Sequence, residues 1–331
     1  PEKAADVAAL PYDVVNREEA KSIGDENPLS FLHIDRPEMD LEPETDLYDD
    51  RVYEKAKENL DNMEEKGILV QDQKACYYIY ELVRKGKTQT GIVGCSSIDD
   101  YMNGVVKKHE LTREDKEQDR IHHVDSCNAN TGPIFLACRY PDSLLTLMNN
   151  WKDHHEAAYD FTEEDQITHR VWVIDEDEVI SEINKEFAGI DSLYIADGHH
   201  RAASAVKVGL KRREQNPGYT GEEEFNYFLS VVFPYDQLCI LPVKDLNGLT
   251  VKAFLGALKF NFELMLMPGF PCKPVEKHCM GMYVDGQWYH LKAWPDIYEK
   301  KDVVGQLDVS ILQEKVLRPV LGIEDPRTDQ R

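Results

Sequence analysis

The sequence predicts a mixed α/β (α+β) fold in which mixed sheets carry flanking helices. Short runs rich in β-branched and aromatic residues alternate along the chain with longer stretches that carry helix start and stop signals. The alternation contains no internal repeat, which is typical of α/β and α+β domains. The 331 residues, 42% hydrophobic and 30% charged, suffice for two domains with a sizeable core.

The predicted helices are bounded by residues that begin or end helices. The stretch 47–66 precedes Gly67, and a glycine after a periodic stretch is a frequent helix stop. By the same reasoning, the alanine-rich helix that opens after Gly198 is predicted to end at Gly209. The other predicted helices span residues 17–23, 98–103, 113–124, 143–151, 176–187 and 308–317.

The predicted strands are short and apolar. Residues 75–83 and 88–95 flank a Lys- and Gly-containing turn and are predicted to form a hairpin. Gly91 and Gly94 in its second strand are interpreted as packing positions. The remaining predicted strands span residues 132–138, 169–174, 193–196, 227–234, 238–243, 278–284 and 287–294.

We expect three segments along the chain. Residues 1–90 form an N-terminal α+β segment that includes an acidic loop, residues 91–235 form a core that holds the motifs described below, and residues 236–331 form a C-terminal α+β segment. The first residue is Pro1, and residues 325–331 read like mid-chain sequence. The sequence is therefore expected to be a trimmed piece of a longer protein.

The charge and the cysteines narrow the function classes. A net charge of −24 repels nucleic acid and anionic membranes, and the basic cluster of Lys207 with residues 211–213 is short. No stretch reaches the roughly 18 apolar residues of a membrane span. The seven cysteines are scattered and odd in number, with no C-x-x-C pair. We therefore expect a cytoplasmic protein whose cysteines are reduced.

The most informative motif lies at residues 193–201, where an apolar run ends in Asp197-Gly198 and a helix follows. The first turn of a helix attracts anions through its unpaired N–H groups and dipole. Arg201 suits bidentate phosphate contact, and Gly198 allows close backbone approach. Asp197 is placed to hold a metal ion or cap the turn, and His199 and His200 add two imidazoles. The alternative is an ordinary strand–helix junction with a capping Asp and exposed histidines.

A second candidate group surrounds Glu110, where an apolar segment meets a helix start. Such a carboxylate can act as a general base, although a capping box or a charged helix surface would explain the same residues. His109-Glu110 is not part of an H-E-x-x-H motif, because position 113 is arginine. The paired histidines at 122–123 and 154–155 lack partners at ligand spacing, which does not favour zinc. The chain also lacks Walker A, G-x-G-x-x-G and G-x-S-x-G motifs.

Taken together, residues 108–110 and 194–209 resemble the catalytic and nucleotide-binding motifs of the free-serine kinases in the ParB/sulfiredoxin-like superfamily. The core at 91–235 is therefore expected to contain a ParB/sulfiredoxin-like nucleotide-binding fold. His199 stands where sulfiredoxins carry their reactive cysteine, and the basic helix-turn-helix of ParB proteins is missing. Over its full length the chain resembles a prokaryotic family of unknown function, numbered one-zero-one-five. The segments that carry this second resemblance are residues 10–14, 109–112, 130–135, 197–201 and 322–327.

The resemblance implies a nucleotide-dependent small-molecule phosphotransferase. Gly198, His199, His200 and Arg201 would bind ATP or ADP, and Asp197 would hold Mg²⁺. Glu110 and His200 would be catalytic, and a small hydroxylated, serine-like compound would be the acceptor. A non-catalytic nucleotide-binding regulator is the first alternative, and a scaffold role is the second. The oligomeric state stays open.

Overall fold

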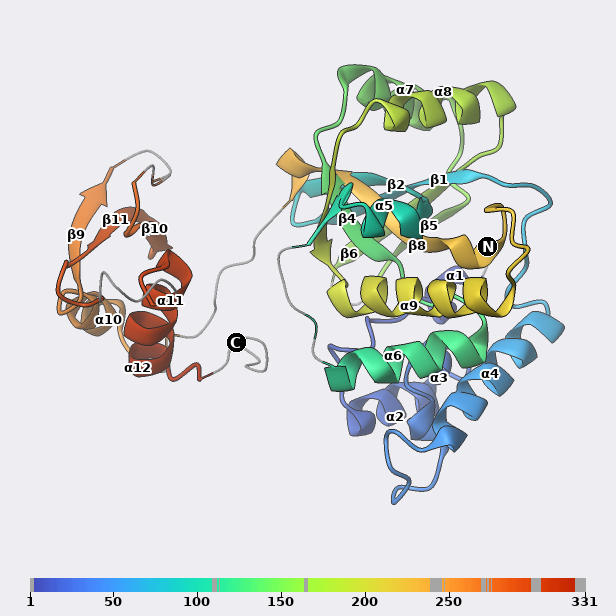
Figure 1. Ribbon diagram of the computed structural model, residues 1–331, viewed down its shortest axis with the longest axis horizontal. Coiled ribbons are helices and arrows are strands. Elements are labelled where there is room, and N and C mark those ends of the chain that lie inside the picture. Colours follow the sequence, from blue (N-terminus) through green and yellow to red (C-terminus); the bar gives the residue numbers. More distant parts are fainter. Residues whose placement is uncertain are drawn as a thin grey trace. The chain divides into compact units, whose positions relative to one another are not determined.

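The computed structural model describes residues 3–108, 112, 114–163, 166–238, 246, 248–268, 272, 274, 276–298 and 305–324. The chain divides into two compact units, residues 1–239 and 240–331, which are described separately below (Figure 1). Both units combine sheets with helices, so the predicted mixed α/β class is confirmed. The chain passes from the first unit to the second a few residues after the predicted boundary at 235 and 236.

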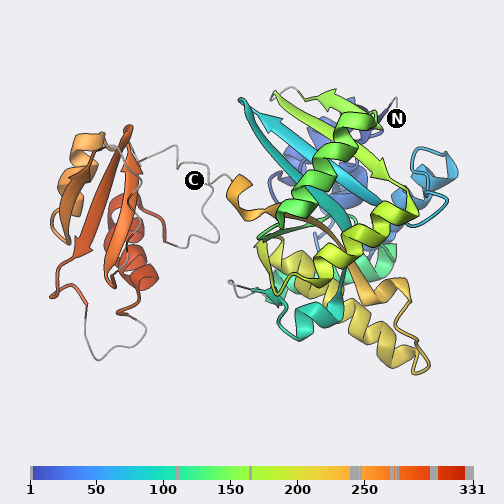
Figure 2. The same ribbon diagram turned by 90° about the horizontal axis from the view of Figure 1, so that it is seen from above.

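The first unit is built on an eight-stranded mixed sheet with the order β3-β7-β4-β8-β2-β1-β6-β5 (Figures 1 and 2). Pairings β3–β7 and β4–β8 are parallel, and the others are antiparallel. The strands are β1 Tyr77–Arg84, β2 Lys87–Ser97, β3 Val106–Lys107, β4 Ile134–Cys138, β5 Tyr159–Thr162, β6 Ile167–Ile174, β7 Leu193–Asp197 and β8 Tyr227–Pro234.

The predicted hairpin is present as β1 and β2, which pair antiparallel around Lys85 and Gly86, both at positive φ. Gly91 and Gly94 are packing positions as predicted. A Cβ on Gly91 would lie 2.5 Å from the carbonyl oxygen of Val232. The sequence-based boundary at residues 90 and 91 falls inside β2, so segments 1–90 and 91–235 share this sheet.

Two helices, α7 (Asp142–His154) and α8 (Asp177–Ala188), lie together on one side of the sheet (Figure 1). Their apolar faces bury a core against β1, β2 and β6. This core includes Ile79, Ile92, Leu144, Met148, Trp172 and Ile183.

Helices on the other side of the sheet follow one another in layers (Figure 1). Helix α9 (His199–Gln215) packs on β4 and β8, helix α6 (Glu114–Cys127) packs on α9, and helix α4 (Asp50–Glu65) packs on α6. The core under α9 includes Ile134, Leu136, Ile195, Ala202, Val206 and Phe228. The smaller helical elements are α1 Ala4–Val7, α2 Arg17–Glu26, α3 Leu32–Asp35, the 3-10 helix Pro37–Asp40 and α5 Ile98–Met102.

The prediction that Gly209 ends the helix after Gly198 is wrong, because α9 continues to Gln215. Gly209 is buried where the helix meets a neighbouring backbone. A Cβ on this residue would lie 2.3 Å from the carbonyl oxygen of Phe225 and 2.9 Å from Ile98. The glycine therefore allows two chain segments to pack closely. The helix continues through this position.

Substitution Gly209→Ala is expected to lower the free energy of unfolding of the first unit. Alanine normally stabilises a helix interior by roughly 1 kcal/mol over glycine, but overpacking costs about 1–3 kcal/mol, and a carbonyl oxygen has little room to retreat. Urea denaturation of the full chain measures the effect. The control is Gly256→Ala, also inside a helix but with nothing within 4 Å of its Cβ position. An unchanged or stabilised Gly209→Ala protein would contradict this explanation.

The second unit contains a three-stranded antiparallel sheet with the order β10-β11-β9. Its strands are β9 Phe262–Met267, β10 Cys279–Val284 and β11 Gln287–Ala293. Its helices are α10 Val251–Leu258, α11 Asp308–Leu312, a π-helical turn Gln313–Leu317 and α12 Arg318–Leu321. Helices and sheet share one apolar core that includes Phe254, Phe262, Leu291, Ile311 and Val316. The predicted strand 238–243 lies almost wholly outside the described residues.

Candidate functional site

Strand β7, Gly198 and helix α9 form the predicted strand–turn–helix. Gly198 has φ 89° and ψ 33°, a left-handed conformation that strains any residue with a side chain. Arg201 folds back over this turn. Its Nη2 donates to Asp197 Oδ2 at 2.6 Å, and its Nη1 donates to the carbonyl oxygen of Pro133 at 2.7 Å. The guanidinium is therefore held beside the helix N-terminus.

The side chains of the turn differ in their exposure. The Asp197 side chain is 63% exposed, whereas that of Arg201 is 16% exposed. His199 is buried and His200 is partly buried. The hydroxyl of Ser204 donates to the carbonyl oxygens of His200 at 2.7 Å and Glu117 at 3.1 Å, which joins the first turns of α9 to α6. The Asp197 side chain is therefore the more exposed member of its pair with Arg201.

Glu110 lies outside the described residues, so its assignment as the catalytic carboxylate stays a prediction. The described strand before it is informative. Lys107 pairs with Tyr194 in the parallel ladder between β3 and β7. Glu110 and Asp197 each follow these paired residues by three positions in sequence. Parallel strands have their carboxyl ends at the same edge of a sheet, where α/β proteins bind ligands.

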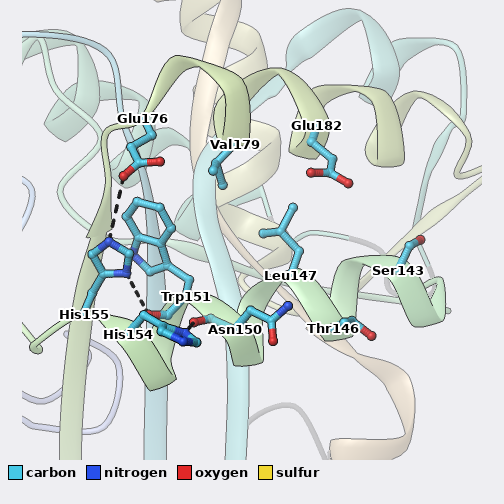
Figure 3. A pocket seen from close by; sticks show the side chains of 10 residues that line it. All are labelled: Ser143, Thr146, Leu147, Asn150, Trp151, His154, His155, Glu176, Val179 and Glu182. Atoms are coloured by element: carbon cyan, nitrogen blue, oxygen red, sulfur yellow. Dashed lines mark hydrogen bonds and ion pairs between the residues drawn. The ribbon is translucent and has the colours of Figure 1, made fainter.

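A cavity of about 490 Å³ lies along α7 and α8 (Figure 3). It contains the paired histidines His154 and His155. His155 stacks on Trp151 at 3.7 Å between ring centroids, and its Nε2 lies 4.0 Å from a carboxylate oxygen of Glu176. Both Nδ1 atoms bond backbone carbonyl oxygens one turn earlier. These contacts explain the histidines as helix-end groups.

A cavity of about 730 Å³ is lined in part by Arg201 and so borders the turn. Segment 7–12 forms one wall, strands β1 and β6 form another, and α6 and the loop 130–134 close it. Three of the segments that carry the full-length resemblance therefore meet here: residues 10–12, 130–134 and Arg201. The structure brings them together from distant parts of the sequence.

Polar groups gather where this cavity approaches Arg201. The buried guanidinium of Arg120 lies 4.2 Å from the ring centroid of Tyr12, and the hydroxyl of Thr131 donates to Asp35 at 2.6 Å. Burial raises the pKa of Tyr12 to about 12 and also raises the pKa of Asp35. Arg120 and Arg201 both act electrostatically on Tyr12 and Asp35 in the opposite sense. The permanently charged guanidinium groups of Arg120 and Arg201 therefore both lie near this end of the cavity.

Sequence reasoning missed the contribution of Tyr12, Asp35 and Thr131 to this cavity. The segments around Tyr12 and Thr131 carry part of the full-length resemblance, but the sequence alone assigns them no chemical role. A signal was present, because both combine polar side chains with proline or glycine in short irregular stretches. Asp35 offered no comparable signal, since it ends a short helix.

The basic cluster after the turn is neutralised within the fold. Lys207 pairs with Glu117, Lys211 and Arg212 both pair with Asp125, and Arg213 pairs with Asp99. Burial works against ionisation of Glu117, but its bonds from Lys207 and Thr112 and the nearby His200 hold its pKa below the usual range. These pairs fix α9 to α6 and α5, leaving Arg201 as the arginine of α9 that lines the cavity.

His123 lines the cavity and is expected to make the free energy of unfolding depend on pH. Its Nε2 donates to the carbonyl oxygen of Ile34 at 2.9 Å, and burial lowers its pKa from 6.5 to about 4. Between these values the unfolded chain binds a proton that the folded chain does not, so stability falls as pH drops from about 6.5 to 4. Urea midpoints at pH 7 and pH 5 measure this loss.

The substitution His123→Gln should reduce this loss of stability between pH 7 and pH 5. The substitution His122→Gln, at the exposed neighbouring residue, should not reduce it. Equal pH dependence of wild type and His123→Gln would assign the effect to other groups.

Among the described residues, Asp197 is not part of a preformed cluster of metal ligands. Within the described ranges, no group of three or more His, Cys, Asp or Glu side chains could hold a metal ion.

In the part of the chain that the structure describes, no helix combines the length and hydrophobicity needed to cross a bilayer. The family described as "Protein of unknown function (DUF1015)" matches residues 1–310. A match of this extent shows that the chain belongs to that family. No curated protein and no solved structure matches the chain.

Proposed function

We propose that this member of the DUF1015 family is a nucleotide-dependent phosphotransferase that acts on the hydroxyl group of a small molecule. The observation that carries the proposal is the turn at Gly198. There a left-handed glycine, a helix N-terminus and a positioned arginine meet beside the large cavity. This combination is suited to terminal phosphates, which are stabilised by positioning and charge neutralisation.

Four residues of the turn have separable tasks. Arg201 contacts phosphate oxygens, and the backbone at Gly198 allows them close to the first turn of α9. Asp197 is the carboxylate that would hold nucleotide-borne Mg²⁺, which supplies charge neutralisation when bound. Arg201 donates to Asp197, so each side chain restricts the orientation of the other. His200, the second residue of α9, is proposed to donate to a phosphate oxygen.

Glu110 is proposed to accept the proton of the acceptor hydroxyl. The terminal phosphoryl group then bonds to the acceptor oxygen, the bond to the leaving nucleotide breaks, and the hydroxyl proton passes to the carboxylate. The parallel pairing of β3 with β7 supports this role, because Glu110 follows Lys107 as Asp197 follows Tyr194. The core around these strands is proposed to be ParB/sulfiredoxin-like.

Calorimetric titration with ATP and ADP in Mg²⁺, followed by assays for nucleotide product with L-serine and other hydroxylated compounds, tests the proposal. Product formation that depends on the acceptor supports a phosphotransferase. Nucleotide binding without turnover would instead place the protein with non-catalytic regulators. Failure of every nucleotide to bind would overturn the proposal and leave a scaffold role.

A further inference from the structure

The cavity beside the turn is larger and more apolar than a serine-sized acceptor requires. Its 730 Å³ lie within the range of sites that enclose drug-sized ligands. Its walls carry aliphatic and aromatic side chains, including Leu10, Phe31, Leu82 and Ile167. A three-carbon polar acceptor would leave most of this apolar surface in contact with water.

A second cavity of about 390 Å³ adjoins the first and is also lined by the N-terminal segment. The two share Val7, Tyr80 and His169 among their lining residues, and the second adds Phe161. His169 stacks on Phe161 at 5.2 Å between ring centroids, and its Nδ1 is hydrogen-bonded to the Tyr80 hydroxyl at 2.8 Å. Aromatic side chains therefore line the region where the two cavities are adjacent.

We propose that this cavity binds the phosphoryl acceptor, and that the acceptor is a hydroxy compound with a large apolar body. The inference rests on the proposed function. The hydroxyl group lies at the Arg201 end, next to the transferred phosphoryl group, and the apolar body extends between segment 7–12 and strands β1 and β6. Burial of that body supplies affinity.

The lining argues against the nucleoside as the occupant. A nucleobase carries hydrogen-bond donors and acceptors around its edge, and buried polar groups without partners are costly. Apolar side chains such as those of Ala8 and Leu82 make up most of the lining. An apolar body needs no hydrogen-bond partners against such walls, whereas the polar groups near Arg201 can meet a hydroxyl or carboxyl group.

Calorimetry with L-serine and 3-phenyllactate tests the acceptor class, in the presence of Mg²⁺ and a non-hydrolysable ATP analogue. Phenyllactate is expected to bind at least about tenfold more tightly, because burial of a phenyl-sized group accounts for that factor. Equal affinities, or no binding of phenyllactate, would overturn the inference. The analogue titrated alone reports on the proposed function separately, since its binding does not need the acceptor.

Two variants fill the cavity from opposite walls, Leu82→Trp from β1 and Ala8→Phe from the N-terminal segment. The control is Val83→Trp, because adjacent strand residues face opposite sides of the sheet and Val83 does not line the cavity. Both filling variants should weaken phenyllactate binding about tenfold or more without changing analogue affinity. Weaker analogue binding would assign the cavity to the nucleoside, and unchanged phenyllactate binding would exclude it as the acceptor site. Either result overturns the inference.

Discussion

Replacing Glu110 with glutamine is expected to abolish phosphoryl transfer while leaving nucleotide affinity nearly intact. A general base contributes about 10²–10⁴-fold to the rate and acts on the acceptor. Its loss should therefore leave the affinity for the nucleotide donor unchanged. Glutamine keeps the shape of the side chain but cannot take up a proton. The measurement is product formation with each hydroxylated acceptor, together with a binding curve for the nucleotide alone.

Glu114→Gln is the matched control, because this glutamate is exposed at the start of α6 and has no proposed contact with substrate. It should retain the wild-type rate. A wild-type-like rate for Glu110→Gln would remove Glu110 as the base. Loss of nucleotide binding in that variant would instead place Glu110 among the groups that contact phosphate or metal.

The elements of the fold that could be predicted from sequence are those set by local interactions. Hairpin β1–β2 follows from a glycine turn between two β-branched runs, and β7–α9 follows from an apolar run that ends in Asp197-Gly198. The strand order could not be predicted, because β4 pairs in parallel with β8 across about ninety residues. Strand β3 has only two residues, Val106 and Lys107, too few for a periodic signal.

The candidate site also has one part that could be predicted from the sequence and one part that could not. The turn from Asp197 to Arg201 could be predicted because strand, glycine and helix follow one another directly. The cavity could not, because Tyr12, Asp35 and Thr131 reach it through tertiary packing of separate segments. Glycine is favoured both at a helix stop and at a close packing contact, so the local sequence around Gly209 does not distinguish the two. Only the position of Phe225 in the folded chain does.

Replacing Arg201 with alanine is expected to cause the largest loss of nucleotide affinity of any substitution on α9. Charge-assisted hydrogen bonds of this kind contribute about 1.5–3 kcal/mol, which corresponds to roughly a 10- to 150-fold increase in Kd. Lys207→Ala should have a smaller effect, since Lys207 lies about two turns further along the helix and pairs with Glu117. Calorimetric titration with ATP in Mg²⁺ compares the variants.

Arg213→Ala separates phosphate binding from a general weakening of the helix. Arg213 lies near the other end of α9 and, like Arg201, donates to an aspartate, with bonds of 2.7 and 2.9 Å to Asp99. Its loss removes a comparable ion pair far from the turn, so it should change thermal stability without changing Kd. Arg201→Lys keeps the charge but loses the planar pair of donors, and an intermediate affinity is expected. Equal affinities for Arg201→Ala and Arg213→Ala, with both proteins folded, would show that the turn at Gly198 does not bind the phosphates.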